Sequence, residues 1–263
     1  MGLGPDLAEE QHTRTSVVSA LRQRTTPMSE SNLTQETEAD GLPIASPDSP
    51  PGEVNGEQIK MASDPRGKLA EQFRNLRNSI VALNPDGAPR TIAIASAVAG
   101  EGKTVAAINL AIALAELPGN QVLLLDGNMH GPMLETYLGL PRCKGVADVL
   151  RGGCSLDAAL RRTSLPGVSV MGAGSLPENS SRLLGSERTR VVFNQLKQRF
   201  SYILIDTPEA LSISDASLLG ALADGILLVV RIGSTSKVLV EQANHQLESL
   251  GGNVLGTCLV GGL

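Results

Sequence analysis

The sequence has few aromatic residues and no tryptophan. Its 263 residues include two tyrosines and three phenylalanines, and acidic side chains outnumber basic ones, which gives a net charge of −5. Proteins that bind single-stranded nucleic acids stack the bases on aromatic side chains, and nucleic-acid backbones attract basic surfaces. This composition therefore argues against a nucleic acid as partner.

Cysteine is also rare. Cys143, Cys154 and Cys258 are odd in number, far apart in the sequence and unaccompanied by a histidine cluster. Disulfide frameworks and zinc sites need paired or closely spaced ligands. We therefore expect three reduced thiols, as in a cytoplasmic protein.

Long apolar segments are missing as well. The N-terminus, MGLGPDLAEE, has neither the basic start nor the apolar run of a secretion signal. The stretch GILLVVRI is far shorter than the roughly 20 residues that cross a bilayer. We expect no direct membrane span, so that any work at a membrane requires a partner.

Residues 1–65 differ in composition from the rest of the chain. They are rich in Ser, Thr, Glu, Pro and Gly and show no sustained periodicity. Such a segment cannot bury enough apolar surface to offset its ordering entropy. We predict a disordered polar tail over residues 1–65, either a tether or regulatory tail or a dispensable extension, and a folded domain over residues 66–263.

Regular periodicity begins after residue 65. Apolar residues recur at three- and four-residue intervals from Leu69 to Leu83, which predicts an amphipathic helix. Beyond it, continuously apolar runs alternate with helical stretches, as expected for strands covered on both faces. The runs are residues 91–96, 121–126, 168–172, 202–206, 225–231 and 253–260, and the helical stretches include 103–116, 187–199 and 236–250. This rhythm predicts an α/β fold with a doubly wound, mostly parallel sheet and helices on both faces.

A glycine-bearing loop, AVAGEGKT, follows the first apolar run and opens directly onto a helical stretch. Strand, loop, Lys-Thr and helix are the context of a Walker A motif in a P-loop NTPase. The loop glycines free the backbone N–H groups to face a phosphate, while Lys103 reaches the β- and γ-phosphates and Thr104 binds Mg²⁺. The predicted nucleotide-binding residues of this segment are Ala99, Gly100, Glu101, Gly102, Lys103, Thr104 and Val105.

Two aspartates end apolar runs, Asp126 in QVLLLD and Asp206 in YILID. Ligands in such sheets bind beyond the carboxyl ends of the strands, so both carboxylates are predicted to hold Mg²⁺ together with Thr104; capping a turn is the alternative for each. Lys103, Asp126 and Asp206 form the predicted catalytic group. Arg231 also ends a strand, where it approaches the nucleotide or forms a structural ion pair.

Two other classes of phosphate-binding protein fit the loop less well. Partitioning and cell-division ATPases carry a second lysine near the start of the loop, and Val98 occupies that position here. Dinucleotide-binding turns do not place Lys-Thr after the glycine.

The remaining motifs resemble those of the bacterial tyrosine kinase family, the cytoplasmic autokinases of capsule and exopolysaccharide export. The similarity runs from about residue 69 to residue 259. Glu71, Arg74 and Arg77 match the family's E-x-x-R-x-x-R helix, AGEGKT its Walker A motif, LLLDGNMHGP its A′ motif and YILIDTP its Walker B motif. The segments LGL…GVADVLRGG and LPENSSRLL match two further parts of the family pattern.

The resemblance implies several properties at once. ATP and Mg²⁺ are the implied cofactors, and the Glu71–Arg74–Arg77 helix would mediate ring-like self-association; from the residues alone, a plain solvent-facing helix is the alternative. A membrane-spanning polysaccharide co-polymerase or adaptor is the implied partner. It would recruit this cytoplasmic protein to the inner face of the plasma membrane.

The sequence departs from the family pattern in places that bear on catalysis. No tyrosine follows Tyr202, whereas family members end in a tyrosine cluster; Asn128 replaces the second aspartate of the A′ motif, and His130 replaces its basic residue. An asparagine cannot accept a proton as a carboxylate can. We predict an ATP-dependent tyrosine kinase-like phosphotransferase acting in exopolysaccharide synthesis and export. The alternatives are a catalytically weak, nucleotide-switched scaffold of the same family and a positioning ATPase of the partitioning type.

Overall fold

The computed structural model describes residues 53–54, 56–88 and 90–261. The prediction of disorder for residues 1–52 therefore lies outside the described residues. Within the described part, seven strands form one sheet. They are β1 (Arg90–Ser96), β2 (Val122–Asp126), β3 (Arg161–Arg162), β4 (Val168–Met171), β5 (Tyr202–Asp206), β6 (Gly225–Arg231) and β7 (Val254–Val260).

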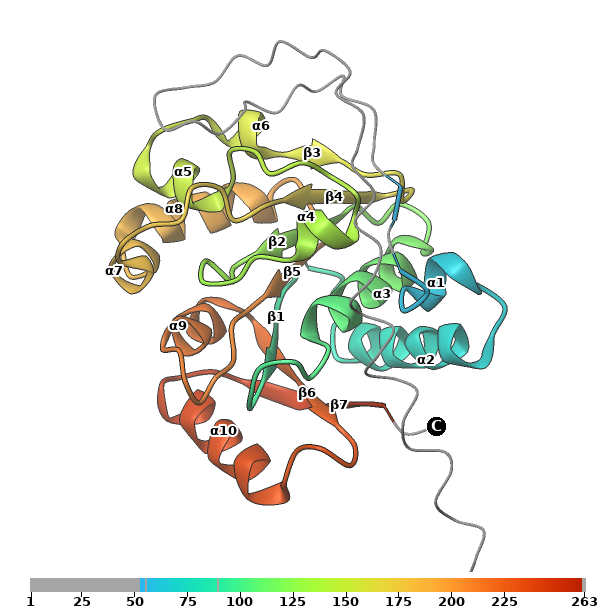
Figure 1. Ribbon diagram of the computed structural model, residues 1–263. Coiled ribbons are helices and arrows are strands. Elements are labelled where there is room, and N and C mark those ends of the chain that lie inside the picture. The colour runs from blue at the N-terminus through green and yellow to red at the C-terminus, as the bar shows by residue number, and fades with distance from the viewer. Residues whose placement is uncertain (1–52, 55, 89, 262–263) are drawn as a thin grey trace, which may run out of the picture. The chain divides into compact units, whose positions relative to one another are not determined.

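The strand order is β3-β4-β2-β5-β1-β6-β7 (Figure 1). Neighbouring strands run parallel, apart from the antiparallel pair of β3 and β4. The register places Asp126, the last residue of β2, beside Asp206, the last residue of β5. The predicted mostly parallel sheet is confirmed, and the two aspartates meet at its carboxyl edge.

Helices cover both faces of this sheet (Figure 1). In the described part of the chain they are α1 (Lys60–Ser63), α2 (Lys68–Ala82), α3 (Lys103–Ala115), α4 (Leu134–Tyr137), α5 (Val146–Arg151), α6 (Leu156–Ala159), α7 (Ser180–Leu184), α8 (Glu187–Lys197), α9 (Asp215–Leu222) and α10 (Lys237–Ser249). Ile92 and Ile94 of β1 pack on the side of α2, α3 and α4. The alternate residues Ala93 and Ala95 pack with α9 and α10 on the other side. Both faces of β1 are thus buried, which explains its continuously apolar sequence.

The strand predicted over residues 253–260 is an exception to burial on both faces. β7 is the edge strand of the sheet next to β6, and its residues are half-buried or exposed, with Leu259 63% exposed. An apolar run alone does not distinguish a central strand from an edge strand. The strand was predicted correctly, but its cover on both faces was not.

The folded part begins before the predicted boundary at residue 66. Residues 56–64, which we call the N-terminal strap, place Ile59 in the main core with none of its surface exposed and bury Met61. Asn109, fully buried in the middle of α3, accepts a hydrogen bond from the N–H of Met61 (2.9 Å) and donates one to the carbonyl of Gln58 (3.2 Å). The prediction of disorder up to residue 65 is therefore wrong for this strap. The buried amide of Asn109 in α3 needs hydrogen-bond partners, and the backbone of the strap supplies them.

We expect Ile59→Val to lower the free energy of unfolding by about 0.5–1.5 kcal/mol, because it removes one buried methylene group from a packed core. Leu69→Val is the matched control, since Leu69 is 40% exposed at the start of α2. Urea denaturation of the two variants checks this. Equal losses of stability would mean that the strap does not belong to the cooperative core.

Candidate nucleotide-binding site

The loop between β1 and α3 takes the conformation of an anion-binding loop. Gly100 and Gly102 have φ angles of 78° and 91°, a left-handed region that side chains with a Cβ rarely enter. Gly102 is the N-cap of α3, so the first N–H groups of this helix open toward the loop. Uncapped N–H groups at a helix N-terminus attract phosphate oxygens.

Lys103 lies inside the loop rather than in solvent. Its Nζ donates a hydrogen bond to Ser96 Oγ at 2.9 Å, and the residue is 8% exposed. Burial lowers the pKa of the amine, whereas the charges of Asp206, Glu209 and Glu101 oppose that change. The ammonium group is therefore held beside β1 and next to acidic groups.

Thr104, Asp206 and Asp126 meet at the carboxyl edge of the sheet. Thr104 Oγ1 donates to Asp206 Oδ2 at 2.5 Å, while Asp206 Oδ1 is buried without a hydrogen-bond partner. Burial raises the pKa of Asp206 to about 6, although the bond from Thr104 opposes this. Burial, and then the charge of Asp206, also raise the pKa of Asp126 well above its ordinary value.

These three residues fit a magnesium ion. Mg²⁺ prefers oxygen ligands and keeps several waters or phosphate oxygens in its octahedral shell. A divalent cation here would partner the unpaired oxygen of Asp206 and reduce the repulsion between two buried carboxylates. The donor set of Thr104, Asp206 and Asp126 is therefore chemically suited to Mg²⁺.

Glu101 lies within the predicted nucleotide-binding segment, but its side chain points into the protein. Its carboxylate accepts hydrogen bonds from the N–H of Val98 (3.0 Å), the N–H of Arg231 (3.3 Å) and the hydroxyl of Thr235. Glu101 is 2% exposed, and its hydrogen bonds connect the loop to the end of β6. A role in nucleotide binding would have to come from its backbone.

The other predicted contacts differ in exposure. Ala99 and Gly100 are exposed at the tip of the loop, whereas Val105 is half-buried against the core. Arg231 is exposed, and it forms no ion pair with the residues that the structure describes. Its guanidinium group is thus available at the end of β6.

Arg74 and Arg77 do not face solvent in the way that the helical pattern predicted. Arg74 donates two hydrogen bonds to Glu116, the C-cap of α3, at 2.9 and 2.7 Å. Arg77 donates to Glu116 at 3.1 Å and to the carbonyl of Ala113 at 3.2 Å. The hydrogen bond from Arg74 lowers the pKa of Glu116. Both arginine side chains reach the C-terminus of α3, where cations are favoured. Glu71 is the exposed member of the predicted motif, since 65% of its side chain is exposed.

Asn128 has a structural role in the loop after β2. Its side-chain oxygen accepts the N–H groups of His130 (3.3 Å) and Gly131 (3.1 Å), and its Nδ2 donates to the carbonyl of Gly131 (3.0 Å). The amide is thus used in turning the loop. Asparagine side chains commonly form turns of this kind.

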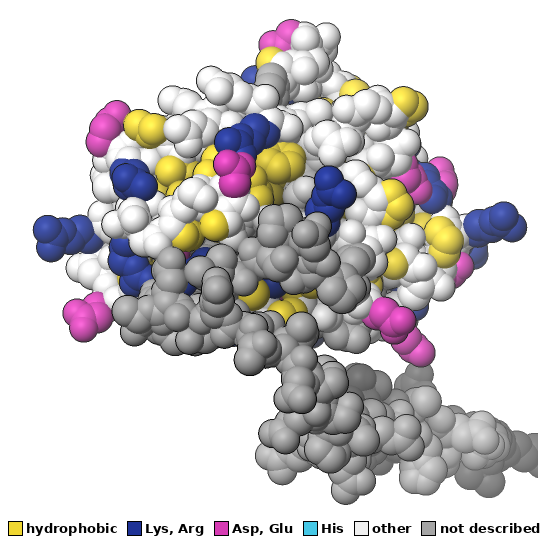
Figure 2. Space-filling model, turned by 90° about the horizontal axis from the view of Figure 1, so that it is seen from above, with side chains coloured by type: hydrophobic (Ala, Val, Ile, Leu, Met, Phe, Trp, Pro, Cys, Tyr) yellow, Lys and Arg dark blue, Asp and Glu magenta, His cyan; other side chains and the backbone are white. Residues whose placement is uncertain are grey.

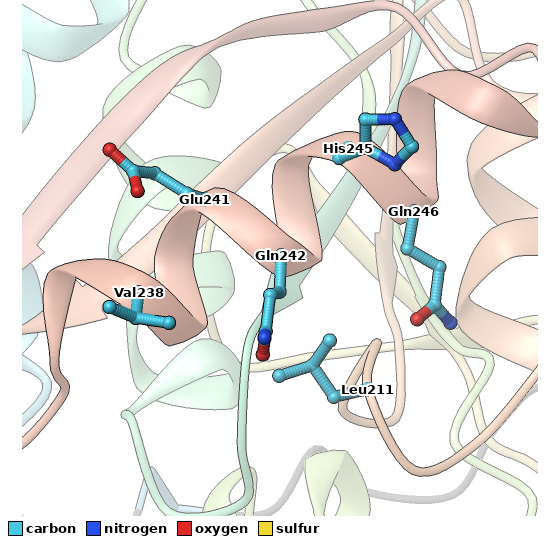
Figure 3. Close-up of a pocket in the computed structure, with 6 residues that line it drawn as sticks. All are labelled: Leu211, Val238, Glu241, Gln242, His245 and Gln246. Atoms are coloured by element: carbon cyan, nitrogen blue, oxygen red, sulfur yellow. The ribbon is translucent and has the colours of Figure 1, made fainter.

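A pocket of about 550 Å³ lies beside α10 (Figure 3). It is lined by Leu211, Val238, Glu241, Gln242, His245 and Gln246. Gln246 Nε2 donates to the carbonyl of Ala210 at 2.6 Å, and the N–H groups of Ala210 and Leu211 donate to the carbonyls of Ser96 and Ala97. The segment after β5 therefore connects this pocket to the glycine loop between β1 and α3.

One face of the described residues is seen in Figure 2. Lysine and arginine side chains on this face lie singly or beside acidic ones. Binding to a nucleic-acid backbone relies on clustered basic charge, and this face does not present such a cluster. Among the described residues, no helix has the length and apolar character that crossing a bilayer requires.

The fold and the site define a P-loop NTPase-like protein: a glycine loop between a strand and a helix, with two aspartates at the carboxyl edge. A family model described as "AAA domain" matches residues 89–251. The chain is 30% identical over 199 residues to the tyrosine-protein kinase YwqD of Bacillus subtilis, a match that covers 76% of this chain and 84% of YwqD. The chain belongs to the bacterial tyrosine-protein kinase family.

Solved structures agree with this assignment. The kinase domain of the Escherichia coli tyrosine kinase ETK has a TM-score of 0.74 and 26% identity, covering 77% of this chain and 79% of that chain. The septum site-determining protein MinD of Pyrococcus horikoshii, complexed with Mg-ADP, has a lower TM-score of 0.56 at 27% identity, with 65% and 70% covered. The family resemblance read from the motifs is confirmed.

Sequence reasoning missed several residues that shape the site. Ser96, which holds Lys103, ends a strand without a motif of its own, and Glu116 lies far from Arg74 in the sequence. Asp215, the first residue of α9, lies within hydrogen-bond distance of His130, a loop residue 85 positions earlier. Contacts between elements so distant in sequence leave no periodic signal.

Proposed function

We propose that this chain binds ATP with Mg²⁺ in the loop after β1 and transfers the γ-phosphate to tyrosine hydroxyl groups of proteins. The observation that carries the proposal is the pair of Thr104 and Asp206, whose buried, unpartnered Oδ1 suits a metal ion. Names of similar proteins support it: YwqD and ETK are tyrosine kinases, and MinD was solved with Mg-ADP.

Each residue has a definite task in this proposal. The N–H groups at the start of α3 bind the phosphates, and Lys103 turns from Ser96 toward the β- and γ-phosphates. Thr104, Asp126 and Asp206 hold Mg²⁺, which would supply positive charge against the phosphate oxygens. Arg231, exposed at the end of β6, adds a second cation beside the nucleotide.

The biological setting that we propose is exopolysaccharide or capsule synthesis and export. The chain would work in the cytoplasm, recruited to the inner face of the plasma membrane by a membrane-spanning co-polymerase or adaptor protein. Support comes from the family and from the absence of a helix able to span a membrane in the described residues.

A catalytically weak, nucleotide-switched scaffold is the second candidate. Asn128 favours it, because this residue stands where the family has a carboxylate and its amide is used within the loop. The positioning ATPases are a weaker alternative, since Val98 offers no lysine to a neighbouring nucleotide.

Two measurements on the wild-type protein test the proposal. Calorimetry with and without Mg²⁺ measures ATP binding, and a phosphotyrosine blot after incubation with ATP and a tyrosine-rich peptide measures transfer. Metal-dependent binding with transfer supports the kinase. Binding without transfer would support the scaffold, and no binding would contradict both.

Self-association through α2 is part of the proposal and rests on Glu71. We expect Glu71→Lys to weaken assembly about tenfold or more in ATP–Mg²⁺, about 1.4 kcal/mol, because it reverses the exposed charge of the motif. The matched control is Glu187→Lys on α8, since Glu187 is also exposed and also pairs with an arginine three residues on. Analytical ultracentrifugation measures both, with circular dichroism to verify folding.

Assembly that responds equally to both variants would contradict an interface at α2. A wild type that stays monomeric at high concentration would contradict it too. Alanine variants of Arg74 and Arg77 are less suitable tests, because they also break the bonds to Glu116 within the chain.

A further inference from the structure

His130, Asp215 and Ser180 form a hydrogen-bonded group at the carboxyl edge of the sheet. His130 lies in the loop between β2 and α4, whereas Ser180 and Asp215 are the first residues of α7 and α9. His130 Nε2 lies 3.1 Å from Asp215 Oδ2 and 3.2 Å from Ser180 Oγ. None of these residues is among the proposed ligands of Mg²⁺.

The contacts of Asp215 determine which nitrogen of His130 carries the proton. Asp215 is completely buried, and its Oδ1 already accepts a hydrogen bond from the hydroxyl of Ser181 at 2.5 Å. Its Oδ2 is an acceptor as well, because an ionised carboxylate has no proton to donate. With Asp215 ionised, His130 donates from Nε2, and the lone pair of the neutral imidazole then lies on Nδ1.

The imidazole of His130 is half-exposed. The side chain of His130 is 49% exposed although its partner Asp215 is fully buried. Nδ1 makes no hydrogen bond with the residues that the structure describes. The imidazole thus has one nitrogen fixed to the protein and the other, basic nitrogen open to an incoming group.

The loop that carries His130 is anchored beside the proposed metal site. Asp126 accepts the N–H of Asn128 at 3.1 Å on one side of the loop and that of Met133 at 3.0 Å on the other. His130 follows Asp126 by four residues, a stretch that spans at most about 14 Å. Because Asp126 pairs in register with Asp206, His130 lies within this reach of the carboxyl edge that carries the proposed metal site.

We propose that His130 is the proton acceptor for the hydroxyl group that attacks the γ-phosphate, and that Asp215 is its positioning residue. This inference rests on the proposed phosphotransfer. It also supplies the proton acceptor that is missing at Asn128. The amide of Asn128 cannot accept a proton, whereas an oriented histidine two residues later can.

The step balances as an in-line displacement. The proton of the tyrosine hydroxyl passes to Nδ1 of His130 while the phenolic oxygen forms a bond to the γ-phosphorus. The bond between the γ-phosphorus and the β,γ-bridging oxygen breaks, and its electron pair leaves with ADP. The imidazolium so formed is stabilised by the carboxylate of Asp215 and returns its proton to water.

The test uses phosphorylation of a synthetic tyrosine-rich peptide with ATP–Mg²⁺, over about pH 5.5 to 9, which brackets the titration range of histidine. His130→Gln should lower kcat by about 100-fold or more while the calorimetric affinity for ATP stays within about threefold. The acidic limb of the pH profile should disappear in this variant. Asp215 is the charged residue, within the described chain, that hydrogen-bonds to the imidazole, and Ser180 is its other partner.

Two further variants separate a chemical role from a structural one. Free imidazole should restore part of the activity of His130→Ala, because the site is half-exposed. Asp215→Asn should lower kcat about tenfold or more, since it no longer sets the tautomer. His245→Gln is the control, because His245 is an exposed histidine on α10, and its activity should not change.

Each outcome decides the assignment. Activity within about threefold of wild type in His130→Gln would overturn His130 as the base and leave the kinase proposal intact. A loss of ATP affinity, or no rescue by imidazole, would assign His130 to loop structure instead. A wild type that binds ATP but phosphorylates no peptide would overturn the phosphotransfer, and the proton acceptor with it.

Discussion

Replacing Asp206 with asparagine should make the metal-free protein more stable and, in the same variant, remove the effect of Mg²⁺ on ATP binding. Asp206 is fully buried, one of its oxygens has no partner, and its pKa is raised from 3.8 to about 6. A rise of that size corresponds to about 3 kcal/mol of unfavourable free energy for the ionised side chain. The amide remains partly unsatisfied, so the expected net gain is about 1–2 kcal/mol.

The gain depends on pH in a definite direction. Below the ordinary pKa of 3.8 the carboxyl group is protonated in both the folded and the unfolded chain, and the variant has no advantage. As pH rises through 3.8, the unfolded chain releases its proton first, so the wild type loses stability until the folded pKa of about 6 is passed. The stabilisation by asparagine should therefore be complete above about pH 6 and vanish near pH 4. Urea denaturation in the presence of EDTA measures it.

Asp148→Asn is the matched control. Asp148 is also buried, but its carboxylate accepts hydrogen bonds from Gly145, Arg151 and Ser175 at 2.9, 2.9 and 3.1 Å. This variant should lose about 1–3 kcal/mol of stability, because the amide cannot accept all the hydrogen bonds that the carboxylate accepts. It should keep metal-dependent ATP binding. A destabilised Asp206→Asn protein without metal would contradict the account of a site built for a cation.

Lys103→Met is expected to weaken ATP binding at least tenfold, about 1.4 kcal/mol, and to reduce phosphotransfer further. The change removes the cation that the proposed function places nearest to the β- and γ-phosphates. Methionine fills much of the space of the buried lysine stem. Since burial lowers the pKa of this amine, losing the ammonium group should not destabilise the empty protein.

Calorimetry with ATP–Mg²⁺ measures the affinity, and thermal unfolding verifies the fold. Lys197→Met is the control for loss of a lysine charge: Lys197 pairs with Asp224 at 2.8 Å, and Asp224 precedes the amino end of β6 at the opposite edge of the sheet. Unchanged ATP affinity in Lys103→Met would sink the assignment of the phosphate-binding loop.

The main elements of this fold are readable in the sequence because each leaves a strong local pattern. β2, β5 and α3 were located to within about a residue, since buried parallel strands are continuously apolar and the Gly-Lys-Thr motif marks the start of α3. β3 and the short helices α4 to α7 have too few residues to show periodicity. The strap at Ile59 was missed for the same reason, as it has two buried side chains within a polar segment.

The residues of the candidate site show the same difference between local motifs, which can be recognised in the sequence, and contacts between distant residues, which cannot. Lys103, Thr104 and the two aspartates could be named from motifs, and the structure brings Thr104, Asp206 and Asp126 to one place. The inward orientation of the Glu101 side chain and the partners of Arg74 could not be predicted from motifs. Both depend on contacts with side chains that are far away in the sequence. The tautomer of His130 likewise follows from a carboxylate 85 positions away.

The N-terminal strap has a mechanical consequence. Asn109 fastens the strap to the middle of α3. The first turn of this helix would face the phosphates in the proposed function, and Glu116 at its end holds Arg74 and Arg77. Ile59 also packs in the core cluster that contains Ile92 and Ile94 of β1, so displacing the strap would disturb both α3 and β1. The strap, the glycine loop and α2 are therefore all attached to one helix, α3, and a substitution that shifts this helix would alter all three contacts.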